Sequence, residues 1–199
     1  MAPRQAQLRH SRQESRDRIV AAATELVRDR SYNELSIGEV MERAGFGRTI
    51  FYRHFDDLGD LLVRASRAAI DQLYASQRPL AEAAASGDAA AIVRKSASQA
   101  VAVYERHGPL LRCVREAADV DERVAEGYDA MRRRFDDFAE QALRQVLGDS
   151  APPHLAETAR ALNLMGETYL TDAFGREPRV SKEVAARTLI EIWDAVIGR

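Results

Sequence analysis

The sequence predicts an all-α fold in which a small three-helix domain precedes a larger helical domain. Three observations lead to this prediction: apolar residues recur at helical spacing over long segments, strand patterns are almost absent, and most prolines and glycines lie between the periodic segments. With 46% hydrophobic and 30% charged residues among 199, the composition is that of a globular chain. We expect about nine helices.

The first three helices are predicted from apolar spacing and from residues typical of helix ends. One helix is expected over residues 11–30. Ser36 predicts the N-cap of a second helix, because Glu39 follows three residues later and completes a capping box. Gly45 ends this helix, since glycine readily adopts the left-handed conformation found at helix C-termini. A third, very short helix is expected over residues 48–54.

The remaining helices are separated by breaks that contain glycine or proline. The segment Ser86-Gly87-Asp88 ends one pattern, and Asp88 can cap the next helix. We interpret His107-Gly108-Pro109 as a hard break, because proline interrupts helical hydrogen bonding. The resulting helices are expected over about 57–85, 88–106, 109–118, 121–147, 154–174 and 181–197.

The segment AGFGRTIFYRHF (44–55) places two short helices around a tight turn, which is a helix-turn-helix arrangement. On a helical wheel, the apolar residues of the second helix share one face with His54, and cationic and polar residues share the other. This outer face carries no acid and consists of Arg48, Thr49, Tyr52 and Arg53. Such a face can enter a DNA major groove, where arginine bridges guanine O6 and N7 and tyrosine reaches a phosphate. The alternative is that these residues are only the solvated face of a small helix.

Charge is distributed unevenly along the chain. The net charge is −2, but five arginines and two acids occupy the first eighteen residues. These residues are Arg4, Arg9, Arg12, Arg16 and Arg18, with Glu14 and Asp17. A local basic patch is compatible with nucleic-acid binding even when the total charge is near neutral.

The segment SIGEVMERAGFGRTIFYRHFDDLGDLL (36–62) resembles the DNA-binding signature of the TetR family of bacterial repressors, and the resemblance covers roughly residues 11–75. It implies a DNA-binding domain over 1–56 and a ligand-binding and dimerisation domain over 57–199. It also implies a cytoplasmic homodimer that binds a palindromic double-stranded DNA operator and is released by a small, mostly apolar ligand. The DNA contacts that it implies are Ser36, Gly47, Arg48, Thr49, Tyr52, Arg53 and His54.

Two positions depart from the family pattern. Gly47 stands where the family usually has serine or threonine, and Asp56-Asp57-Leu58-Gly59 stands where it usually has a phosphate-binding lysine. The second departure, the Asp56-Asp57 pair in place of the lysine, supports an alternative interpretation, a helical small-ligand-binding or interaction protein that has lost specific DNA binding. The basic N-terminal residues could compensate for the missing lysine.

The C-terminal half carries a second resemblance. The segments ALNLMGETYL (161–170) and EIWDAVIG (191–198) are similar to a mycobacterial member of the family, which implies that Asn163 and Trp193 line a ligand cavity. By spacing alone the aromatic residues are ordinary core, and an interhelical hydrogen bond explains a buried asparagine as well as a ligand does. The expected cavity residues are Tyr104, Met131, Phe135, Phe138, Asn163, Gly166 and Trp193.

The last two helices are predicted to form the dimer interface, because each carries an apolar stripe that a monomer would leave partly uncovered. The stripe residues are Leu155, Leu162, Tyr169 and Leu170 on the first helix, and Leu189, Ile192, Val196 and Ile197 on the second.

Nothing in the sequence indicates an enzyme, a metal site or a cofactor. The four histidines are scattered, no glycine-rich phosphate loop follows a strand, and the lone Cys113 is expected to be a small buried side chain. No segment offers about 18 uninterrupted apolar residues, so we expect no membrane span.

Overall fold

The computed structural model describes the backbone of residues 2–82 and 89–197 and, within these, the side chains of residues 11–76 and 94–196. Its α-helices are α1 (Ala2–Leu26), α2 (Ile37–Ala44), α3 (Arg48–Phe51), α4 (Leu58–Glu82), α5 (Ala89–Ala118), α6 (Glu122–Leu147), α7 (Leu155–Phe174) and α8 (Lys182–Ile197). Short 3₁₀ turns lie at Tyr32–Glu34 and Gly148–Ser150. The all-α prediction is confirmed, and no helix in the described ranges is long and apolar enough to cross a membrane.

The predicted break at residues 107–109 is wrong, so the described part of the chain has eight α-helices instead of about nine. Helix α5 continues through Pro109. A proline removes one helical hydrogen bond, but buried side chains on both sides of it, Tyr104 and Leu110 among them, hold the helix in place. The predicted cap at Asp88 lies outside the described residues.

The first helix spans different residues from those predicted. Helix α1 already begins at Ala2 and ends at Leu26, four residues before the expected end at Arg30. It ends early because the carbonyl oxygens of Val27 and Arg30 both accept hydrogen bonds from Arg112 on α5, which holds this segment in turns. Helix α3 also stops early, at Phe51, and the chain continues through turn hydrogen bonds.

The predicted ends of α2 are confirmed. The backbone N–H of Glu39 donates to the Ser36 hydroxyl over 3.2 Å, and that hydroxyl donates to the Glu39 carboxylate over 2.8 Å. Gly45 ends the helix with φ 74°, in the left-handed region that glycine occupies without strain.

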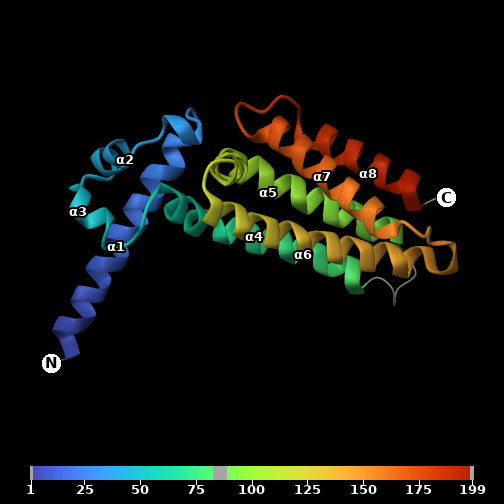
Figure 1. Cartoon of the computed structure of the whole chain (residues 1–199), viewed down its shortest axis with the longest axis horizontal. Coiled ribbons are helices and arrows are strands. Elements are labelled where there is room, and N and C mark those ends of the chain that lie inside the picture. Colours follow the sequence, from blue (N-terminus) through green and yellow to red (C-terminus); the bar gives the residue numbers. More distant parts are fainter. Residues whose placement is uncertain (1, 83–88, 198–199) are drawn as a thin grey trace.

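Helices α1, α2 and α3 pack together at one end of the molecule (Figure 1). Their core contains buried residues from all three helices, from the segment after α3 and from the start of α4: Ile19, Ala22, Ala23, Val40, Met41, Ala44, Phe51, Phe55 and Leu61. Because Leu61 belongs to α4, this core joins the small unit directly to the long helix that follows it. The domain boundary at 56/57 stays a prediction, and α4 begins beside it.

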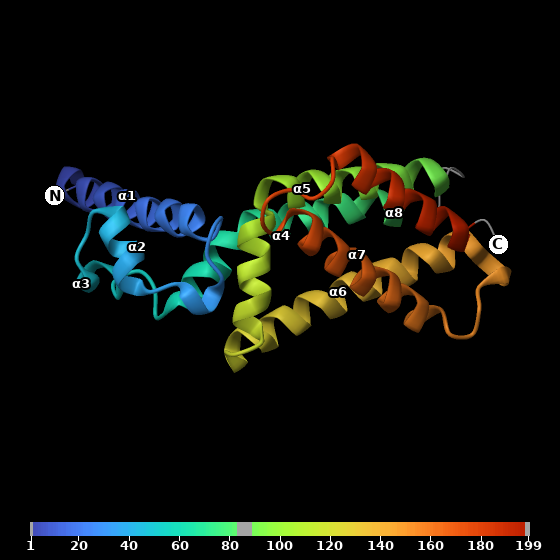
Figure 2. The ribbon, with the colours of Figure 1, turned by 90° about the horizontal axis from the view of Figure 1, so that it is seen from above.

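Helices α4 to α8 form the larger part of the molecule (Figure 2). Helix α5 contacts α4, α6, α7 and α8, so it lies at the centre of this part. A separate cluster joins the two parts: Val27 and Leu35 from the N-terminal region pack with Leu62, Leu110, Cys113 and Val114. The end of α1 therefore rests on α4 and α5.

The apolar stripes expected to face a second copy are largely buried within this chain. Exposure is only 1% for Leu155, 7% for Leu162, 3% for Leu170 and 4% for Leu189. Leu155 and Leu162 pack with Ala139 and Leu143 of α6, and the others pack against the core around α5. The prediction was wrong for these four residues, because α5 and α6 cover them. Tyr169, Ile192 and Val196 are half-buried, and the side chain of Ile197 lies outside the described residues.

Candidate nucleic-acid interface and ligand cavity

The outer face of α3 is exposed, as the helical wheel predicted. Phe51 and Phe55 are buried beneath the helix, whereas Tyr52 is 61% exposed. The other outer residues, Arg48, Thr49 and Arg53, are also exposed. Gly47 precedes the helix as its N-cap residue. A rigid apolar core thus presents a cationic and polar surface to the outside.

Arg48 lies back over the start of α2. A Cβ atom added at Gly38 would stand 2.8 Å from Nη2 of Arg48, so the guanidinium occupies the space that the glycine leaves open. The position of this side chain therefore depends on a residue of the preceding helix.

Two arginines of α1 hold α1 against the helix-turn-helix. Arg12 donates to the carbonyl oxygen of Arg53 over 3.1 Å, and Arg18 donates to that of Ala44 over 2.7 Å. The guanidinium of Arg18 also lies 4.5 Å from the centre of the Phe46 ring. These arginines, noted in the sequence as a basic patch, also have a structural role.

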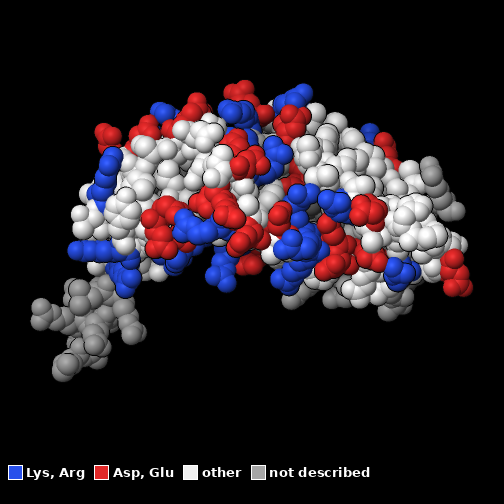
Figure 3. Space-filling model, viewed as in Figure 1, with Lys and Arg blue, Asp and Glu red and all other residues white. Residues whose placement is uncertain are grey.

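Two of the predicted DNA contacts have partners within the domain. The Ser36 hydroxyl caps α2, and Nε2 of His54 lies 2.9 Å from the hydroxyl of Ser15. Burial lowers the pKa of His54, and the positive charges of Arg12, Arg16 and Arg53 lower it further. Three arginine side chains therefore lie near His54 and the outer face of α3. The His54 ring itself is held within the domain by its contact with Ser15. In Figure 3, blue side chains gather around α1 and α3, while blue and red side chains intermingle over the larger part.

The acids at the start of α4 have a structural explanation. Asp57 accepts a 2.9 Å hydrogen bond from the backbone N–H of Asp60 and pairs with Arg123 at the start of α6. Burial opposes ionisation of Asp57, but these hydrogen bonds hold its pKa below the ordinary value. Asp57 therefore caps α4 and ties it to α6, and its charge is paired.

A cavity of about 140 Å³ lies among α4, α5, α6, α7 and α8. Six of the seven predicted residues line it: Tyr104, Met131, Phe135, Asn163, Gly166 and Trp193. The prediction for Phe138 is wrong. Its ring lies beside Tyr74 and beneath the guanidinium of Arg134, away from the cavity lining.

Polar residues on α6 and α7 form a cluster in the cavity wall. Nδ2 of Asn163 donates to Oδ1 of Asp136 over 3.0 Å, so the interhelical hydrogen bond considered from the sequence is present. The Tyr128 hydroxyl donates to Glu167, and Nε of Arg132 lies 3.5 Å from the same carboxylate. Burial raises the pKa of Glu167, although Arg115 opposes the shift.

Sequence reasoning missed most of this cluster. Tyr128, Arg132 and Asp136 recur every four residues on α6, and Asn163 and Glu167 are four apart on α7. That spacing places each set on one helical face. The spacing was visible, but it is also typical of solvated helix surfaces, and only the packing of α6 against α7 turns these faces inward.

The family profile described as "Bacterial regulatory proteins, tetR family" matches residues 19–65, which contain the whole helix-turn-helix. Residues 19–65 therefore form a DNA-binding domain of the TetR type. The chain is a DNA-binding transcriptional regulator of this type, and the TetR family is not a family of enzymes.

Relatives of the TetR family match most of the chain. The transcriptional regulator EthR of Mycobacterium tuberculosis is 27% identical over 179 residues, which cover 88% of this chain and 83% of EthR. Among solved structures, a TetR-family regulator of Syntrophomonas wolfei aligns with a TM-score of 0.72 at 14% identity, covering 94% of this chain and 96% of that one. PfmR of Thermus thermophilus aligns with a TM-score of 0.72 at 18% identity, covering 87% and 95%. These structures confirm the TetR fold.

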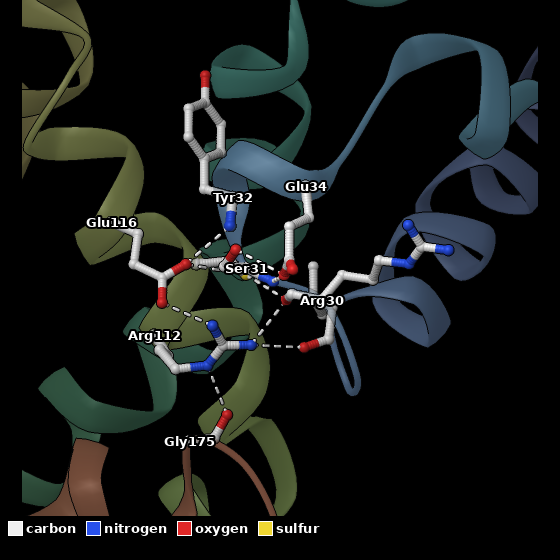
Figure 4. A network of polar contacts seen from close by, with 9 residues as sticks. Arg30, Ser31, Tyr32, Glu34, Arg112, Glu116 and Gly175 are labelled. Atoms are coloured by element: carbon white, nitrogen blue, oxygen red, sulfur yellow. Dashed lines mark hydrogen bonds and ion pairs between the residues drawn. The ribbon is translucent and has the colours of Figure 1, made fainter.

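A buried arginine connects the two parts of the chain (Figure 4). Arg112 on α5 is 5% exposed and donates to the carbonyl oxygens of Val27, Arg30 and Gly175 over 2.7–2.8 Å. It also pairs with Glu116, one turn later, over 2.6 Å. Glu116 in turn accepts a 2.7 Å hydrogen bond from the backbone N–H of Tyr32.

Next to this arginine, Cys113 is fully buried, and burial raises its pKa to about 12. The thiol therefore stays protonated and acts as a small core side chain, as expected from the sequence. Among the side chains that the structure describes, those of residues 11–76 and 94–196, no group of three or more histidine, cysteine and acidic residues is arranged to hold a metal ion.

Proposed function

We propose that this regulator is a homodimeric repressor that leaves its operator when a small ligand occupies the cavity. The observation that carries the proposal is the acid-free outer face of α3, held on a buried core beside the arginines of α1. Arg48 would read a guanine, and Thr49, Tyr52 and Arg53 would contact bases or phosphates. Residues 1–56 would be the DNA-binding domain, and residues 57–199 would bind the ligand and the second copy.

Helix α5 is the proposed connection between ligand and DNA. Ala100, Tyr104 and Leu111 of this helix line the cavity, and Arg112 of the same helix bonds to the end of α1. A ligand that favours one position of α5 would therefore favour one position of the DNA-binding helices. In this proposal α5, as well as α4, transmits a change in the cavity to the DNA-binding helices.

The proposed dimer interface is the outer face of α7 and α8. Val184 of α8 is 52% exposed, and Leu164 of α7, which also borders the cavity, is 43% exposed, so each helix keeps a partly uncovered apolar side chain. A two-fold axis through such a surface would place two α3 helices about 34–36 Å apart, one turn of DNA. This separation would match a pseudo-palindromic operator.

The alternative of lost DNA binding draws less support from the structure than from the sequence. It rested on Asp56 and Asp57 at the start of α4. The carboxylate of Asp57 is paired with Arg123, so it does not stand free to repel a phosphate.

The proposal is tested with DNA from upstream of the protein's own gene. Footprinting should reveal a palindromic site, and Arg48→Ala should weaken binding to it by about 1–3 kcal/mol. Arg133→Ala, an exposed arginine on α6, is the matched control and should bind like the parent. Unchanged affinity in a folded Arg48→Ala protein would overturn the assignment of α3.

A further inference from the structure

The cavity wall carries more negative than positive charge. Its lining includes two acids, Asp136 and Glu167, and one basic residue, Arg132, which gives a formal charge of 1 − 2 = −1. Arg132 approaches Glu167 only to 3.5 Å, at the long end of an ion pair. Arg115 lies outside the lining and acts on Glu167 without an ion-pair contact, so the carboxylates that line the cavity outnumber the basic groups that line it.

The hydrogen bonds in the wall leave carboxylate oxygens available to a ligand. One N–H of Asn163 is donated to Asp136, and the hydroxyl proton of Tyr128 is donated to Glu167. An ionised carboxylate only accepts hydrogen bonds, and each of these two carboxylates has more acceptor sites than these donors fill. A ligand that donates hydrogen bonds therefore finds partners at Asp136 and Glu167.

The surroundings of Glu167 increase the effect of a positive partner. Its side chain is 19% exposed, and its raised pKa reflects a carboxylate that has lost water without full compensation. Aromatic rings of Tyr104, Phe135 and Trp193 also line the cavity, and such rings attract a cation over their faces.

We propose that the cavity binds a small apolar ligand that carries a protonated amine, with Glu167 as its principal partner and Asp136 as its second. This inference rests on the proposed role of the cavity as the ligand site. The volume of about 140 Å³ suits one ring with a short chain.

Isothermal titration with three matched compounds tests the proposal without DNA. The probes are 3-phenylpropylamine, 3-phenylpropan-1-ol and 3-phenylpropanoate, which share a ring and a short chain and differ in charge. We expect the amine to bind about tenfold more tightly than the alcohol or more, since a hydrogen bond to a charged group is stronger than a neutral one. The carboxylate should bind most weakly.

Three variants locate the amine. Glu167→Gln should weaken amine binding about tenfold and change alcohol binding less than about twofold. Asp136→Asn should weaken amine binding by a smaller factor and provides a second test if Glu167→Gln fails to fold. Glu157→Gln removes a carboxylate from the exposed face of α7, the helix that carries Glu167, and should change the binding of neither the amine nor the alcohol.

The proposal is overturned if the carboxylate binds most tightly, if the three probes bind equally, or if none binds. Because the titration contains no DNA, its result is separate from that of the footprint. A chain that binds the amine and leaves no footprint would retain this inference and lose the proposed repressor role.

Discussion

The guanidinium of Arg112 on α5 donates a 2.8 Å hydrogen bond to the carbonyl oxygen of Val27, just after the end of α1. The same guanidinium also holds the carbonyl oxygen of Gly175, after α7. One buried side chain therefore fixes three segments that are far apart in the sequence.

Replacing this arginine should loosen the connection. We expect Arg112→Met to lower the free energy of unfolding by about 3 kcal/mol, because several buried carbonyl groups lose their partner. Hydrogen exchange should become faster at residues 27–35 and remain slow in the core of α6. Arg133→Met is the control, and equal exchange in both variants would contradict the role of Arg112.

Gly38 should control the position of Arg48. A Cβ atom at this residue would meet Nη2 of Arg48 at 2.8 Å, and a flexible guanidinium can move away. We therefore expect Gly38→Ala to leave the fold intact or slightly more stable, and to weaken operator binding. Gel-shift titration and thermal melting measure the two effects. Gly127→Ala, at an open position on α6, should not change operator affinity, and a Gly38→Ala protein with parental affinity would refute the prediction.

The proposed dimer surface predicts the effect of a new charge. Leu164→Glu should shift the protein towards a monomer in sedimentation experiments, because a carboxylate would have to be buried against the second copy. Val120→Glu is the control, since Val120 is 62% exposed but lies at the turn before α6. A Leu164→Glu protein that remains dimeric would require a different interface.

Glu167 should reduce stability at neutral pH in the free protein. Its pKa is raised in the folded chain, so the stability that it contributes is complete below its ordinary value of 4.5 and is lost as the pH rises through the folded pKa. We expect Glu167→Gln to melt at a higher temperature than the parent at pH 8, and the difference to shrink as the pH falls towards 4.5. Glu157→Gln should show no such trend, and a constant difference across this range would contradict the burial of a costly charge.

The local features of the fold could be predicted because they depend on neighbouring residues. The cap at Ser36, the left-handed Gly45 and the two faces of α3 each follow from a few adjacent positions, and the structure confirms them. The same holds for the start of α6, where Asp121 accepts hydrogen bonds from the first backbone N–H groups.

The errors concern residues whose state depends on distant segments. Pro109 remains helical because packing on both sides outweighs one missing hydrogen bond, and no local pattern reveals that packing. Leu155 was assigned to a dimer because the sequence does not show that α6 covers it. Phe138 has the spacing of a cavity residue, but Tyr74 and Arg134 surround it elsewhere. Asp136 and Glu167 in the cavity wall were missed because only the packing of α6 against α7 turns them inward.

The close approach of Gly108 to α7 has a mechanical consequence. A Cβ atom at this residue would lie 2.2 Å from the carbonyl oxygen of Phe174, so the two helices touch backbone to backbone without a cushioning side chain. A rigid helix can pivot at such a crossing, so that its two ends move in opposite directions. Ala100 stands about 12 Å along α5 on one side of it, and Arg112 about 6 Å along on the other. If the proposed ligand displaced a rigid α5 at Ala100, Arg112 would move in the opposite direction, through about half the distance.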